Sequence, residues 1–288
     1  MKKLFFAAAL SLMAFPALAQ RDFSDVEIKT TEVAGGVYML EGSGGNIGLS
    51  VGEDGAFVID DQFAPLNEKI TAAIAAVTDK PVKFVLNTHH HGDHTGGNEA
   101  FGESGAYIVA QDNVRKHLEA DESKSPAAAL PIITFSQTIT FFWNGHEIHI
   151  FHPENAHTDG DAIVYFRDIN VIHMGDAFFS GRYPYIDVPG GGSLQGYIAA
   201  LETAVTLVDN ETKIIPGHGP LSAKTDLEAL LAVLKDVRMR VQALIDDGLD
   251  EDAAVAAKPL TDLNEKWSWR FIDGERMTRI AYQSLTAK

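Results

Sequence analysis

The chain of 288 residues contains no cysteine. Disulfides, thiolate zinc sites, iron–sulfur clusters and cysteine nucleophiles are therefore all excluded. If the protein binds a metal ion, histidine and carboxylate side chains must supply the ligands.

Basic residues are also scarce. The chain carries 23 Lys and Arg against 40 Asp and Glu, a formal net charge of -17. A field of this sign repels phosphate backbones and anionic membrane surfaces, so we expect no nucleic-acid partner. With 45% hydrophobic residues, the composition is that of a globular protein, long enough for one large or two small domains.

Long hydrophobic runs are absent except at the start of the chain. Lys2 and Lys3 precede a short apolar run over residues 4–15, and Ala17 and Ala19 form a small-x-small cleavage pattern. This order predicts a signal peptide over residues 1–19 and an exported, periplasmic protein formed by residues 20–288. The run is too short to span a bilayer with margin and no second run follows, so we expect no stable membrane anchor.

The remaining chain alternates strand and helix patterns. Short β-type runs separated by glycine turns predict an antiparallel meander over residues 26–60. Further strands are expected at 82–86, 107–110, 132–150, 162–166, 171–173 and 213–215, with helices at 65–77, near 98, and at 112–120, 194–208 and 221–247.

This order divides into two halves joined by a loop over residues 121–131, and it predicts central sheets with helices outside. The tail, residues 249–288, receives no assigned role. Its acidic cluster, residues 250–252, is expected to be solvated surface.

The densest chemistry follows the strand expected at 82–86, in the segment His89-His90-His91-Gly92-Asp93-His94. Residues two apart in an extended chain point the same way, so His89 and His91 can converge while His90 turns aside. Asp93 and His94, beyond the glycine, can face a second point close by.

Three more candidates, His157, Asp176 and His218, stand in glycine-containing turns beside strands. The whole set of five His and two Asp suits two zinc ions, with iron or manganese as alternatives. Of the other histidines, His117 is expected to be exposed and His173 to be packed, with a supporting role for His173 as the alternative. The spacing of three between His146, His149 and His152 is wrong for one strand face and argues against a further metal site.

The chain contains, in this order, the motif His-x-His-x-Asp-His, a single His, a single Asp and the motif Gly-His-Gly. This order resembles that of the metallo-β-lactamase superfamily, and the resemblance extends from Val26 to about Leu234. It implies an α+β fold, the four-layer αβ/βα sandwich, with metals at one edge of the two sheets. It further implies that one metal is held by His89, His91 and His157, the other by Asp93, His94 and His218, and that Asp176 bridges them. Asp60 and Thr158 match the family's pattern as well, Asp60 as a support for the ligand loop.

Two metals about 3.5–4 Å apart can share a water and lower its pKa toward about 7, which gives a hydroxide nucleophile at neutral pH. We expect this hydroxide to attack a carbonyl, with Asp93 orienting it as the catalytic carboxylate. Such a site predicts hydrolysis as the type of reaction but does not determine the substrate. We expect the substrate to be a small molecule, and we expect that no protein partner is required.

The substrate must be predicted from other features. Export favours β-lactam hydrolysis, as in the class B β-lactamases, and this is the activity that we expect first. Asp176, however, stands where the largest group of these enzymes has a zinc-binding cysteine, and in this respect the chain is similar to glyoxalase II and lactonases. Phe179 stands where those β-lactamases commonly have a lysine that would hold a substrate carboxylate. Arg182 is either a substitute for that lysine or a surface charge. The first alternative to β-lactam hydrolysis is an exported lactonase, esterase or thioesterase, which would differ in the pocket around Phe63, Phe179, Tyr183 and Tyr185. The second alternative is a non-catalytic periplasmic zinc-binding protein.

Overall fold

The computed structural model describes residues 22–120 and 125–287. The expected signal peptide, residues 1–19, and part of the loop over residues 121–131 lie outside the described residues. Within the described ranges, no helix has the combination of length and apolar character that crossing a bilayer requires.

Two β-sheets form the centre of the molecule. The first is ordered β1-β2-β3-β4-β5-β6-β7 and the second β12-β11-β10-β9-β8. The first sheet is antiparallel from β1 to β4 and parallel from β4 to β7. Its strands are β1 (Lys29–Ala34), β2 (Val37–Glu41), β3 (Ile47–Ser50), β4 (Ala56–Ile59), β5 (Val82–Leu86), β6 (Tyr107–Gln111) and β7 (Ile133–Phe135). The second sheet contains β8 (Thr138–Trp143), β9 (His146–Phe151), β10 (Ile163–Phe166), β11 (Val171–His173) and β12 (Lys213–Ile215).

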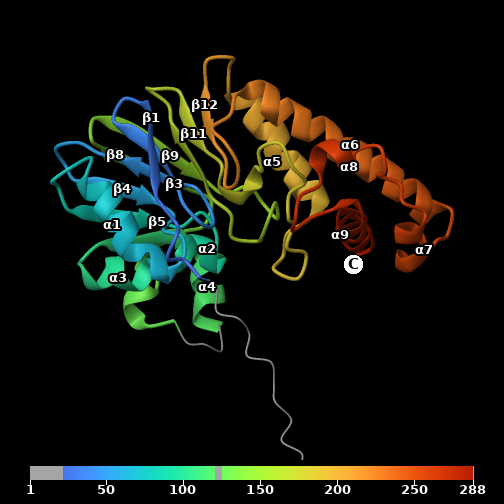
Figure 1. The fold of residues 1–288 in the computed structure, drawn as a ribbon, viewed down its shortest axis with the longest axis horizontal. Helices are drawn as coiled ribbons and strands as arrows, with labels where there is room; N and C mark the ends of the chain where they lie inside the picture. Colours follow the sequence, from blue (N-terminus) through green and yellow to red (C-terminus); the bar gives the residue numbers. More distant parts are fainter. Residues whose placement is uncertain (1–21, 121–124, 288) are drawn as a thin grey trace, which may run out of the picture.

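Helices cover the outer face of each sheet (Figure 1). Beside the first sheet lie α1 (Asn67–Ala75), α2 (Gly92–Thr95), α3 (Asn98–Glu103) and α4 (Asp112–Ala120). Beside the second lie α5 (Leu194–Leu207), α6 (Lys224–Asp246), α7 (Glu251–Ala256), α8 (Asn264–Trp267) and α9 (Gly274–Thr286). The described residues also form three short 3-10 turns, η1 (Ala64–Leu66), η2 (Ala127–Ala129) and η3 (Gly175–Ala177).

The hydrophobic core lies in three layers between these elements. Phe57 and Leu86 of the first sheet pack against Ile148 and Phe166 of the second. The other face of the first sheet is packed against α1 and α3, and the other face of the second sheet against α5, α6 and α9. The molecule is therefore a four-layer αβ/βα sandwich, as the resemblance implies.

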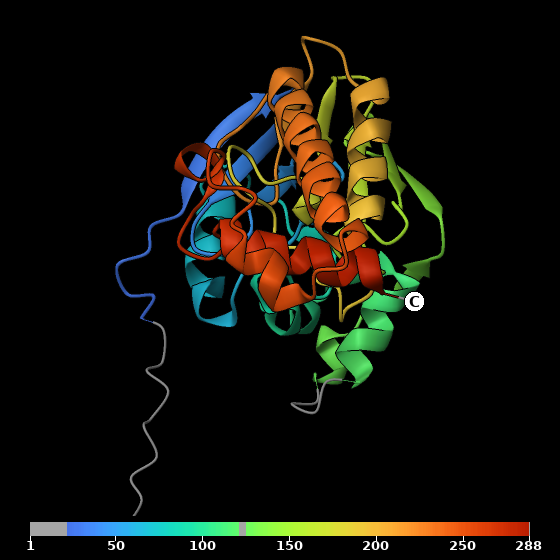
Figure 2. The same cartoon turned by 90° about the vertical axis from the view of Figure 1, so that its right-hand side faces the viewer.

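One feature of the fold differs from the expectations, and the tail, for which no structure was expected, is now defined. Strand β7 follows the loop but pairs with β6, so the first half of the fold continues past residue 131. The tail forms three helices, and Figure 2 shows α9 lying across α6.

The acidic cluster lies at the surface, as expected, with Asp250 and Asp252 exposed. Asp250 caps α7, and Glu251 and Asp252 form surface ion pairs with Arg279 of α9.

Candidate metal centre

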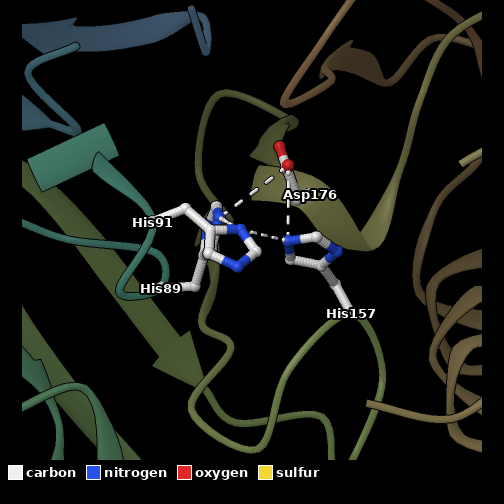
Figure 3. A group of neighbouring side chains, drawn as sticks. All are labelled: His89, His91, His157 and Asp176. Atoms are coloured by element: carbon white, nitrogen blue, oxygen red, sulfur yellow. Dashed lines mark hydrogen bonds and ion pairs between the residues drawn. The ribbon is translucent and has the colours of Figure 1, made fainter. Parts of the chain in front are cut away.

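The first group of predicted ligands meets at one edge of the two sheets. His89 and His91 lie on the loop that follows β5, His157 lies between β9 and β10, and Asp176 lies in η3 after β11 (Figure 3). Nδ1 of His91 is 3.1 Å from Nε2 of His89 and 3.0 Å from Nε2 of His157. Oδ2 of Asp176 is 3.8 Å from Nε2 of His89 and 3.5 Å from Nε2 of His157.

The second group adjoins the first. Oδ2 of Asp93 is 3.8 Å from Nε2 of His94 and 3.5 Å from Nε2 of His218. The remaining oxygen of Asp176, Oδ1, is 3.2 Å from Nε2 of His94 and 3.4 Å from Nε2 of His218. Asp176 thus presents one carboxylate oxygen to each group, which is the arrangement in which a single side chain can bridge two ions.

These residues fit metal ions on two counts. Tetrahedral ligands about 2.0–2.1 Å from a zinc ion lie roughly 3.3 Å from one another, which is close to the separations within both groups. In addition, Nε2 of His94 and Oδ1 of Asp176 are buried without a hydrogen-bond partner. Buried polar atoms are rarely left unsatisfied, and a metal ion would satisfy both.

Hydrogen bonds orient the rings of His94, His157 and His91 from behind. Nδ1 of His94 is 2.7 Å from Oδ2 of Asp60, whose carboxylate also accepts the backbone N–H and the hydroxyl of Thr88. Nδ1 of His157 is 2.8 Å from the carbonyl oxygen of Tyr185. Such contacts fix which ring nitrogen faces the ligand site. The expected supporting position of Asp60 is what the structure shows.

The third of these contacts comes from Asp187, which the sequence did not single out. Oδ2 of Asp187 is 2.9 Å from Nε2 of His91, and Oδ1 accepts the backbone N–H of Gly190 at 3.1 Å. Asp187 follows no strand and stands far from the histidine motif in the chain, so no local pattern marks it.

Asp161 is a second carboxylate that the sequence did not single out. It is buried and accepts the backbone N–H groups of His157 and Thr158 as well as the Thr158 hydroxyl, so it holds the turn that carries His157. Burial raises the pKa of Asp161 to about 7.

Burial and neighbouring charges set the ionisation of the centre. Burial lowers the pKa of His89 and brings that of His157 to about 4, which leaves both imidazoles neutral. Burial alone would raise the pKa of Asp176, but nearby His218, His94 and His89 hold it well below its usual value. Neutral imidazole and ionised carboxylate are the forms that bind metals.

His94 shows the opposite balance. Burial opposes its positive charge, but Asp176, Asp60 and Asp93 raise its pKa well above the usual value. Three carboxylates around one buried ring make this position favourable for a cation, as expected of a metal site.

Most of the other histidines behave as expected. His90 turns away from the centre and stacks on His117, with ring centroids 4.1 Å apart. His173 is buried, close to the carbonyl oxygen of Asn46 (3.1 Å) and accepting the N–H of Gly175, so it supports the backbone. His146, His149 and His152 have separate partners, namely Asp168, Thr140 and the carbonyl oxygen of Asp161.

The expectation that His117 is exposed is wrong in part. Its side chain is 33% exposed, and its Nε2 lies 2.8 Å from Oδ1 of Asp159. The packing of α4 against the ligand loop, which brings His90 onto the ring, accounts for this partial burial.

The ligands open into a cavity of about 280 Å³. Its floor is formed by metal-site residues and its walls by aromatic rings, and the lining consists of Phe63, His91, Asp93, Asp176, Phe179, Tyr185, His218, Trp269 and Phe271. The expected pocket positions of Phe63, Phe179 and Tyr185 are confirmed. Trp269 and Phe271, from the unassigned tail, were not anticipated.

Two expectations about the pocket are not met. Tyr183 is fully buried in the core with α5, α6 and α9 and does not reach the cavity. Arg182 is not a free surface charge, since its guanidinium stacks on the ring of Trp269 at 5.1 Å. It does not line the cavity either.

Comparison with known proteins agrees with this geometry. The family model of the metallo-beta-lactamase superfamily matches residues 40–218. A hydroxyacylglutathione hydrolase of Polaromonas sp. is 27% identical over 198 residues, which are 67% of this chain and 68% of the relative. One of the same name from Pelagibacter ubique is 33% identical over 100 residues, covering 34% of this chain and 37% of the relative.

Solved structures share the fold at low identity. A metallo-beta-lactamase from Pontibacter korlensis matches with a TM-score of 0.63 and 21% identity, over 73% of this chain and 100% of that one. A sec-alkyl sulfatase matches with a TM-score of 0.71 and 16% identity, over 90% of this chain and 50% of that one. The family model covers more than half of the chain, and the fold and the clustered His and Asp residues agree with it: this protein belongs to the metallo-β-lactamase superfamily.

Proposed function

We propose that this protein is a dinuclear zinc hydrolase that cleaves a carbonyl compound of small size. The observation that carries this proposal is the placement of Asp176, with Oδ2 directed to one ligand group and Oδ1 to the other. The centre opens into a cavity, and a catalytic metal site must be open to its substrate in this way. Structural zinc sites, by contrast, are closed, so the open centre disfavours the non-catalytic alternative.

The reaction divides between the bound metal and the residues of the chain. Two zinc ions in this centre would supply a water of lowered pKa and polarise the substrate carbonyl. Asp93 lines the cavity with its side chain 26% exposed, so its carboxylate can accept a hydrogen bond from the attacking water and orient it. Asp60 and Asp187 hold His94 and His91 in place, and aromatic rings form the walls around the centre.

For the bond that is cleaved, we propose an ester, lactone or thioester. The relatives named hydroxyacylglutathione hydrolase favour this class, as does the carboxylate at position 176. β-Lactam hydrolysis is the second candidate, favoured by the proposed export to the periplasm through residues 1–19. Against it, Phe179 occupies the cavity wall where a lysine would hold a carboxylate.

A metal analysis combined with a substrate panel tests this proposal. The panel contains penicillins, cephalosporins, carbapenems, acyl lactones, simple esters and glutathione thioesters. We expect about two zinc ions per chain and turnover of an ester, lactone or thioester that a chelator abolishes. Turnover of β-lactams alone would establish the second candidate, and tight zinc binding without any turnover would contradict the proposed activity.

A further inference from the structure

The C-terminal segment builds one wall of the cavity. Trp269 and Phe271 lie between α8 and α9, and their ring centroids are 5.6 Å apart. Trp269 lies 6.2 Å from the ring of Phe179, and Phe271 lies 5.5 Å from the ring of Tyr185. The four rings thus form a continuous aromatic wall above the metal centre.

This wall is held in place by backbone contacts. The indole N–H of Trp269 donates to the carbonyl oxygen of Tyr183 at 2.9 Å, and its backbone N–H donates to that of Ile272, also at 2.9 Å. Trp267 is buried, and its carbonyl oxygen accepts the N–H of Tyr183 at 2.8 Å. The segment is therefore fixed to the loop that follows η3 and belongs to the structure of the site.

The residues of this wall provide no positive charge that could bind an anionic group of a substrate. Across residues 22–120 and 125–287, no Lys or Arg lines the cavity, and the two acidic residues that do, Asp93 and Asp176, belong to the metal centre at its floor. The two nearby cationic side chains, Arg276 and Arg182, stack on the rings instead. The guanidinium of Arg276 lies 4.0 Å from the ring centroid of Phe271 and 5.6 Å from that of Tyr185. The guanidinium of Arg182 lies over the ring of Trp269. Arg276 also donates to the carbonyl oxygen of Phe271 at 3.0 Å. The net charge of -17 adds a long-range repulsion of anions.

We propose that this wall selects an uncharged substrate that carries a single aromatic ring beside the reacting carbonyl, with Phe271 and Trp269 as its specificity-determining residues. The inference rests on the proposed hydrolase function and narrows its substrate class. A cavity of about 280 Å³ is roughly twice the ~150 Å³ that accommodates benzene, which leaves room for one ring and a carbonyl group. Aromatic rings pack favourably edge-to-face or offset against such walls.

A pair of ketones that the enzyme cannot hydrolyse tests this selectivity by binding alone. The probes are 4-phenylbutan-2-one and 4-(4-carboxyphenyl)butan-2-one, which differ by one negative charge at the far end of the ring. We expect isothermal titration of the full-length, zinc-loaded protein to give at least tenfold tighter binding of the neutral probe. Equal or tighter binding of the carboxylate probe would overturn the proposal, because the cavity would then accept an anionic group as readily as a neutral ring.

Substitutions assign the effect to the wall. Phe271→Ala should weaken binding of the neutral probe about tenfold, because the lost ring contact removes a substantial apolar surface. Phe271 is 46% exposed, so its truncation leaves the core intact, and Trp269→Phe provides a second variant that keeps an aromatic ring. Phe142→Ala, at a ring that is 78% exposed on β8, is the matched control and should bind like the unaltered protein. Unchanged binding by Phe271→Ala would overturn the proposal.

Measurements of turnover distinguish a failure of this inference from a failure of the proposed hydrolase function on which it rests. We expect Phe271→Ala to lower kcat/KM for 2-phenylethyl acetate more than for ethyl acetate, with an unchanged zinc content. If neither ester is hydrolysed while the neutral ketone still binds selectively, the hydrolase proposal fails and the selectivity stands. If both esters are hydrolysed and the ratio of kcat/KM does not change in the variant, the selectivity fails and the hydrolase proposal stands.

Discussion

The seven predicted ligands can be tested one residue at a time. His89→Ala removes a buried nitrogen from the first group, so we expect loss of zinc and of turnover, and Asp93→Ala should likewise abolish turnover. His90→Ala and His149→Ala should keep the zinc content of the unaltered protein, because His90 stacks on His117 and His149 contacts Thr140. Zinc per chain, measured by atomic emission, decides this. A loss of metal in His149→Ala would contradict the ligand assignment.

Asp187 should act on the metal through His91. Asp187→Asn weakens the hydrogen bond that holds the His91 ring, and the loss of such a contact typically costs 10–100-fold in metal affinity. We therefore expect zinc affinity, measured by competition with a chromogenic chelator, to fall by about that factor. Asp168→Asn is the matched control, since Asp168 forms a similar contact of 2.6 Å with His146 away from the centre. An equal effect of both substitutions would show that Asp187 has no specific role.

What the sequence reveals about the centre depends on how locally each residue acts. The residues His89 to His94 form a dense motif, and His157, Asp176 and His218 stand in glycine-containing turns, so the pattern marks all seven. Asp187 reaches His91 across 96 positions, and only the folded loop brings the two together. From the sequence, Tyr183 was as plausible a pocket residue as Tyr185, but its side chain is buried in the core.

At the scale of an element, α9 determines how the aromatic wall is supported. Its first turn carries Arg276, which covers Phe271, and the carboxylate of Asp273 caps the helix by accepting the N–H of Arg276 at 2.8 Å. Asp273→Ala removes this cap and should lower the free energy of unfolding by about 1 kcal/mol. Urea denaturation measures the loss. Asp273→Asn keeps a capping oxygen and should restore most of the stability, so an equal loss in both variants would contradict a role in capping.

Several elements were predictable from helical spacing or from short apolar runs between turn residues. The ranges 82–86, 112–120, 171–173 and 213–215 match β5, α4, β11 and β12 at both ends. The placement of β7 was not predictable, because a strand of three residues carries no signal for the sheet that it joins. The short α7 and α8 likewise lack a periodic pattern, and their positions depend on tertiary contacts.

At the scale of the whole molecule, the metal centre joins the two halves of the sandwich. One half supplies the loop with His89, His91, Asp93 and His94, and the other supplies the turns with His157, Asp176 and His218. Asn46 adds a direct link, since its side-chain amide donates to the carbonyl oxygens of Pro216 and Gly219, both at 2.9 Å. Ions bound between the halves should therefore stabilise the entire fold.

Removal of the metal should accordingly lower the thermal stability of the protein. Without a cation, Asp60, Asp93 and Asp176 remain close together around His94. Free zinc at 100 times its Kd stabilises a native protein by about 2.7 kcal/mol. In a chain of this size, that corresponds to a rise in Tm of roughly 5 °C. Calorimetry of chelator-treated protein should show this loss, and added zinc should reverse it. Asp176→Asn, which weakens both ligand groups, should show a smaller response to zinc. A Tm that does not depend on zinc in the unaltered protein would contradict metal binding by the native fold.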